Sequence, residues 1–120
     1  MSISILGALG GVKLLADARK LIEKEGYSQT STLDPYDKSF SLFGALAKSC
    51  GASRRMIQAY DGDLMSLGLT GQRLGTFVEL VVFLESLVDQ DLEEWCEDAS
   101  CEDVFNLIER ACDRIKIAVS

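Results

Sequence analysis

Histidine is absent from this chain of 120 residues. Histidine is the commonest general acid or base, activates the nucleophile of Ser-His and Cys-His dyads, and is a frequent zinc ligand. Its absence excludes these arrangements and leaves carboxylates, Lys, Tyr and Cys for any reaction. A phosphate-binding loop is also missing, because G-A-L-G-G near the start lacks the required spacing. The sequence therefore favours a binding protein without a cofactor over an enzyme.

Long apolar runs are missing as well. The uncharged stretch at residues 1–12 is too short for a bilayer, which needs about 20 apolar residues. Lys13 follows this stretch, whereas a signal peptide carries its positive charge in front. We expect an arm that packs on the core, a cytoplasmic protein and no membrane contact. Four cysteines are too few for a disulfide scaffold, so we expect thiols.

Only one proline interrupts the chain, which leaves room for long helices. Apolar residues recur with helical spacing in most of the chain, and no segment alternates convincingly over the length of a strand. The sequence predicts an all-α protein, a compact single domain spanning residues 1–120 with about five helices around a central apolar helix. We expect that central helix at 74–88, because this segment is apolar nearly all round.

Local signals predict where several helices begin and end. A first helix over 12–25 should end at Gly26, and a second should cover 38–50. Ser53 is placed to cap a third, short helix. Ser100 followed by Asp103 is a variant of the capping box, so the last helix should begin there. A turn centred on Trp95 would precede it.

Basic residues are absent from residues 74–109, which contain eleven Asp and Glu residues. The net charge of the whole chain is −7. A stretch of one sign repels nucleic-acid phosphates and anionic lipid, and it favours a basic protein partner instead. The candidate binding surface consists of Glu85, Asp89, Asp91, Glu93, Glu94, Glu97, Asp98, Glu102 and Asp103.

A simpler interpretation of these acids is a solvated helix face. Glu85, Asp89 and Glu93 are spaced by four and would line one side of a helix. Such a row of like charges lowers helix stability unless basic groups compensate it. Compensation within the fold would come from Arg54, Arg55, Arg73, Arg110, Arg114 or Lys116. Both interpretations stay open at this point.

The cysteines do not predict a metal site. Cys101 and Cys112 would be separated by roughly 16 Å along the last helix, too far for one zinc ion. Asp61-Gly62-Asp63 lacks the glycine and the glutamate that a calcium loop needs at fixed positions. Cys101 follows a helix cap, but the acids around it oppose activation of its thiol.

Two further binding modes remain possible. A small molecule could bind among Tyr27, Tyr36, Tyr60 and Trp95, because aromatic side chains line many ligand pockets. Alternatively, the thin helix face around Gly44 could pack against a second copy and form a homodimer.

The chain resembles a family of small bacterial and phage proteins of unknown function. The resemblance rests on S-L-F-G-A-L-A at 41–47 and W-C-E-D-A-S-C-E-D-V at 95–104, with Ala111 seven residues after Val104. In that family a Trp-Asn-Asp turn precedes the last helix, and here Cys96 stands in place of Asn. The resemblance implies a helical cytoplasmic domain and no particular activity.

Together these features predict a small acidic helical module for protein–protein interaction. It would act as a regulator or a phage-type inhibitor on a basic, nucleic-acid-binding protein surface. In the inhibitor form, the acids between residues 79 and 103 would imitate nucleic-acid phosphates.

Overall fold

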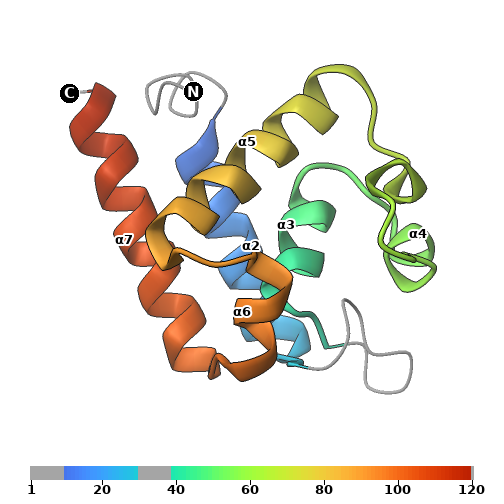
Figure 1. The fold of residues 1–120 in the computed structure, drawn as a ribbon, viewed down its shortest axis with the longest axis horizontal. Helices are drawn as coiled ribbons and strands as arrows, with labels where there is room; N and C mark the ends of the chain where they lie inside the picture. The colour runs from blue at the N-terminus through green and yellow to red at the C-terminus, as the bar shows by residue number, and fades with distance from the viewer. Residues whose placement is uncertain (1–9, 30–38, 120) are drawn as a thin grey trace.

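The computed structural model describes residues 10–29 and 39–119 of the chain. These residues form an all-helical structure, shown in Figure 1. In chain order, the elements are α2 (Gly11–Glu25), α3 (Leu42–Ser49), α4 (Arg54–Gln58), the 3-10 helix η1 (Leu64–Leu67), α5 (Gly71–Val88), α6 (Leu92–Asp98) and α7 (Cys101–Val119). The described ranges contain no strand, only an isolated bridge between Tyr27 and Phe40. The predicted all-α class is confirmed.

The central apolar helix is α3, and the expectation that 74–88 is central was wrong. Every residue from Leu42 to Ala47 is buried, and α3 packs against α2, α4, α5 and α6 (Figure 1). The small side chains of Gly44 and Ala45 allow these neighbours to approach closely. Helix α5 covers 74–88 and buries one side, while Val82 is 48% exposed.

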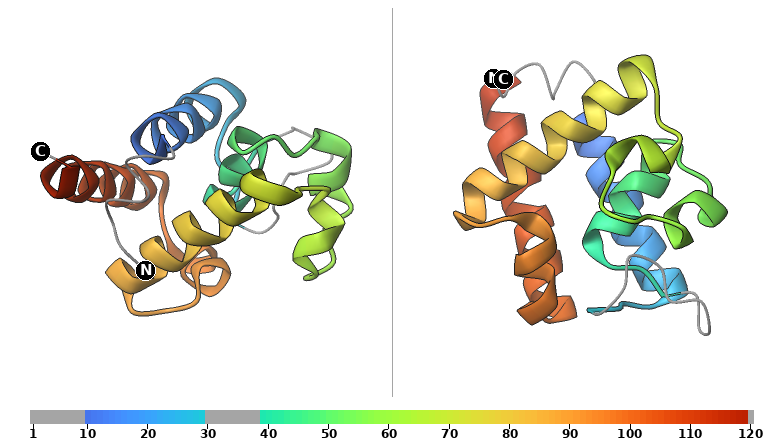
Figure 2. Two further views of the ribbon diagram at one scale, coloured as in Figure 1. Left: turned by 90° about the horizontal axis from the view of Figure 1, so that it is seen from above. Right: turned by 45° about the vertical axis from the view of Figure 1, so that its right-hand side comes forward.

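Helices α2 and α7 lie side by side in both views of Figure 2. They are 15 and 19 residues long, and α2 ends as predicted at Gly26, which has a positive φ of 101°. Glycine adopts this conformation at little steric cost. The predicted apolar stripe of α7 is buried, and it consists of Val104, Leu107, Ile108, Ala111 and Ile115.

Helix α3 begins later than the predicted residue 38. Phe40 is held in extended backbone because its N–H donates to Gly26 O at 3.0 Å and its carbonyl accepts from Ser28 N at 2.9 Å. The helix then begins after Ser41, whose Oγ accepts the Gly44 N–H at 3.1 Å. Residues 30–38, which include the predicted helix start, lie outside the described residues.

The segment around Trp95 is a helix, α6, and not only a turn. The chain turns at Asp89, which adopts the left-handed conformation with φ of 54°. Asp91 then caps α6, since its Oδ1 accepts the N–H groups of Glu93 and Glu94 at 3.1 and 3.2 Å. Because Asp89 separates α5 from α6, the predicted acidic row of residues 85, 89 and 93 does not lie on one helix.

The start of α7 confirms the predicted capping box. Ser100 Oγ accepts the Asp103 N–H at 3.1 Å, and Asp103 Oδ2 accepts the Ser100 N–H at 3.0 Å. The predicted cap of α4 is also present, because Ser53 Oγ accepts the Met56 N–H at 3.2 Å. None of the described helices is both long and apolar enough to cross a bilayer.

Candidate functional site

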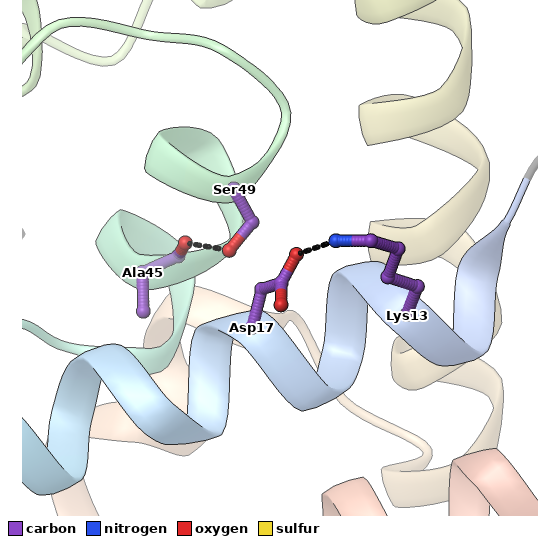
Figure 3. A network of polar contacts seen from close by, with 4 residues as sticks. All are labelled: Lys13, Asp17, Ala45 and Ser49. Carbon is purple, nitrogen blue, oxygen red and sulfur yellow. Dashed lines mark hydrogen bonds and ion pairs between the residues drawn. The ribbon is translucent and has the colours of Figure 1, made fainter.

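The predicted acidic surface extends from the end of α5 through α6 to the first turn of α7. Eight of its nine carboxylate residues are exposed, and Glu85 is half-buried. The ion pairs of the described residues all lie elsewhere: Lys13–Asp17, Arg19–Glu23 and Arg54–Glu25. Figure 3 shows the first of them, with 2.9 Å between Lys13 Nζ and Asp17 Oδ2.

The compensation expected from the arginines is not observed in the described part of the chain. Arg54 pairs with Glu25, and Arg110 Nη2 donates to the backbone carbonyl of Leu87 at 3.3 Å. Neither guanidinium reaches a member of the acidic surface. The negative charge of this surface is therefore not neutralised by ion pairs within the described fold.

Three members of the acidic surface accept hydrogen bonds from backbone N–H groups at helix N-termini. Glu85 Oε2 accepts the Leu92 N–H at 2.8 Å and so joins the end of α5 to the start of α6. Asp91 and Asp103 accept backbone N–H groups at the starts of α6 and α7. A negative charge at a helix N-terminus also interacts favourably with the helix dipole. Folding alone explains why these three residues are acidic.

The other six acids accept no such hydrogen bond, although Glu93, Glu94 and Glu102 lie in the first turns of α6 and α7, where the helix dipole favours negative charge. Within the described residues, their carboxylates make no hydrogen bond or ion pair; they are Asp89, Glu93, Glu94, Glu97, Asp98 and Glu102. Glu97 and Asp98 occupy the last turn of α6, which contains no basic residue. The helix dipole disfavours negative charge at a C-terminus. These two acids therefore reduce the stability of the helix that carries them.

An apolar pocket of about 280 Å³ opens beside the acidic surface, between η1, α5 and α6. Its carboxylates are Glu85, Asp91 and Glu93, and Tyr60 forms part of its wall. The Tyr60 ring packs on Phe43, with 5.2 Å between ring centroids. The main apolar lining residues are Phe43, Leu64, Phe77, Val81, Val82 and Leu92. We call this feature the acid-rimmed pocket.

Carboxylates lie close together in this pocket and raise the pKa values of its titratable groups. Burial raises the pKa of Glu93, and the charges of Asp91, Glu85 and Glu97 raise it further. Burial raises the pKa of Tyr60 to about 12, assisted by four nearby carboxylates, of which Glu93 contributes most. The carboxylate contributions to both shifts indicate a negative potential in the pocket, which a bound cation would relieve.

The predicted aromatic pocket is not assembled in the described structure. Tyr60 lines the acid-rimmed pocket, whereas Trp95 lines a separate hollow beside Arg110. The Tyr27 hydroxyl donates to Ala99 O at 2.7 Å, so it holds the connection between α6 and α7. Tyr36 lies outside the described residues.

A larger hollow of about 550 Å³ lies at the start of α5, away from the acids. Arg73 is the one charged residue among its described lining residues, and Thr70 and Thr76 contribute hydroxyl groups. Thr76 Oγ1 already donates to Gln72 O at 2.8 Å. Among the described residues, none of the predicted site residues lines this hollow, and its charge is opposite to that of the acidic surface.

The four cysteines are free thiols, and none is activated. Burial raises the pKa of Cys50 and of Cys96, in each case to about 11. The pKa of Cys101 is also raised, first by burial and then by the charge of Glu23 on α2. In the described ranges, no three Cys, Asp or Glu side chains come together as metal ligands.

The surface suggested for self-association is already covered. Gly44 is buried within α3 of a single chain, so it is not accessible to a second copy. A homodimer remains a prediction that would require another surface.

Comparison with protein-family models, curated proteins and solved structures found no match to this chain. The resemblance drawn from residues 41–47 and 95–104 therefore stays a prediction.

Sequence reasoning identified the carboxylates of the pocket but not its apolar lining. Phe43, Leu64 and Val82 come from different elements, and each was expected in a helix pattern rather than at a site. Of these three residues, only Val82 could have been identified from the sequence. With Val82, the apolar residues of α5 extend around more of the helix than the one side that is buried, which indicates an apolar residue at the surface.

Proposed function

We propose that this protein is a small acidic helical module that binds a basic surface of another protein. The observation that carries the proposal is the pair Glu97 and Asp98, exposed in the last turn of α6 without a basic neighbour. Charge at this position costs stability. A basic partner would offset that cost on binding and give the acids a function.

The distribution of charge pairs supports the same proposal. The three ion pairs of the described residues involve Asp17, Glu23 and Glu25, all on α2, and leave the acidic surface available. Complementary charge speeds association and fixes the choice of partner. In its finer form, the proposal makes the protein a regulator or phage-type inhibitor that occupies a nucleic-acid-binding groove with its carboxylates.

Binding of a fluorescent lysine-rich peptide tests this function. We expect the Kd to rise at least about tenfold between about 0.05 M and 0.5 M NaCl, because salt screens exposed charges. The double variant Glu97→Gln/Asp98→Asn should weaken binding about threefold at low salt, since each exposed pair contributes a fraction of a kcal/mol.

The matched control is Glu23→Gln/Asp113→Asn, which changes the net charge equally at two exposed positions outside the acidic surface. This control should bind like the wild type. Equal losses in the two double variants would show that only net charge matters, and a Kd indifferent to salt would contradict the proposed function.

A further inference from the structure

The acid-rimmed pocket combines an apolar floor with charged groups that only accept hydrogen bonds. Ionised carboxylates have no donor, and no Lys or Arg among the described residues lines the pocket. We propose that the pocket takes one apolar side chain of a basic partner segment, while neighbouring Lys or Arg residues of that segment pair with Glu85, Asp91 and Glu93. This inference rests on the proposed function and specifies where on the acidic surface the partner is anchored.

The apolar part of the occupant follows from Val82. This side chain is 48% exposed although it lines the pocket beside buried Phe77 and Leu92. Covering it would remove apolar area from water, which is favourable. A volume of about 280 Å³ is large enough to hold one apolar side chain.

The cationic part follows from the crowding of Glu85, Asp91 and Glu93. The three carboxylates face one pocket, and none of them forms an ion pair in the described structure. Their mutual repulsion falls when a cation lies between them. A guanidinium is especially suited, because its planar fork can donate to two carboxylate oxygens at once.

The shape of the surface favours a chain segment over a free amine. A shallower hollow shares Val82, Glu85 and Asp91 with the pocket and extends it to Asp89 and Gln90. Beyond the rim, α6 presents the exposed Glu94. A small cation would contact the carboxylates at one end of this surface only, whereas a basic segment reaches several carboxylates along its length.

Two synthetic peptides test the inference on the wild-type protein. Both contain the same lysines, but one has leucine at its central positions and the other has serine. We expect the lysine–leucine peptide to bind about tenfold more tightly than the lysine–serine peptide. This factor corresponds to the partial burial of one leucine side chain. Butylammonium chloride serves as the free-amine probe and should not compete at equal concentration.

Two variants of the pocket have matched controls. Val82→Ser should abolish most of the preference for leucine, while Met65→Ser, at a 63% exposed position outside the pocket, should keep it.

Glu93→Gln should weaken binding more than Glu94→Gln, because the two residues are neighbours on α6 and only Glu93 lines the pocket.

The outcomes separate this inference from the proposed function. Equal, salt-sensitive binding of both peptides would overturn the anchor and leave the acidic surface as the binding site. Competition by butylammonium at equal concentration would also overturn it, in favour of a small-cation site. Failure of both peptides to bind would overturn the anchor together with the proposed function.

Discussion

The hydroxyl of Tyr27 donates to Ala99 O at 2.7 Å, and Gln29 Nε2 donates to the same carbonyl at 2.7 Å. Two side chains from beyond the end of α2 therefore satisfy the carbonyl that follows α6. Burial is the main reason why the pKa of Tyr27 is raised far above its ordinary value. This tyrosine positions α6, and through α6 it positions the carboxylates of the pocket.

Tyr27 also shows what sequence can reveal about single residues. Its aromatic character suggested a ligand pocket, but its partner Ala99 lies 72 positions along the chain. Only the tertiary fold brings the two together. The exposed acids were predicted correctly as surface residues, since charged side chains are rarely buried without partners. The sequence does not show which of these acids cap a helix and which are unpaired, because this depends on where the fold places the backbone N–H groups.

Glu93 gives a prediction for pH. Its pKa is higher in the folded protein than in an unfolded chain. A carboxyl group with a raised pKa stabilises the fold while it is protonated, and this contribution disappears as pH rises through the folded pKa. Glu93→Gln should therefore gain stability relative to the wild type as pH rises through that value, by about half a kcal/mol or less at neutral pH.

Urea denaturation at several pH values measures this effect. Glu94→Gln is the control, because Glu94 neighbours Glu93 but does not line the pocket. A difference between Glu93→Gln and wild type that stays constant with pH would show that folding does not raise the pKa of Glu93.

The helices differ in how well local sequence defines them. Helix α7 was predicted because its capping box and its apolar stripe are both local signals. Helix α6 was not, because it has only seven residues and its first N–H is held by Glu85 from the preceding helix. Isolated helices of this length are marginal in water, so tertiary contacts determine whether they form.

The composition of α6 leads to a prediction about stability. Removing the negative charges of its last turn with Glu97→Gln/Asp98→Asn should raise the free energy of unfolding by about 0.5 kcal/mol, because the helix dipole no longer opposes them. The same variant should bind the lysine-rich peptide more weakly. A gain in stability together with a loss of binding is typical of residues kept for function.

Urea denaturation of this double variant and of Glu23→Gln/Asp113→Asn measures the difference. The control should be destabilised slightly, because Glu23 loses its 2.9 Å ion pair with Arg19. If the α6 variant were also destabilised, its acids would serve the fold rather than a partner.

Across the whole molecule, charge is separated along the chain and in space. The ion pairs of the described residues lie on α2 and between its last residue and α4, whereas none of the nine members of the acidic surface, from Glu85 to Asp103, forms one. The asymmetry along the chain can be counted in the sequence, which left open whether basic residues of the fold pair with these acids. The sequence could not predict the pocket, which forms only where η1, α5 and α6 meet.

Mapping where a basic peptide binds provides the decisive measurement. In a titration of ¹⁵N-labelled protein with the lysine–leucine peptide, we expect the largest amide shifts at Tyr60, Val82 and Glu93, around the acid-rimmed pocket. Shifts should be small near Arg73, at the larger hollow at the start of α5. Largest shifts around Arg73, or an absence of shifts at saturating peptide, would contradict the proposal that this protein is an acidic interaction module.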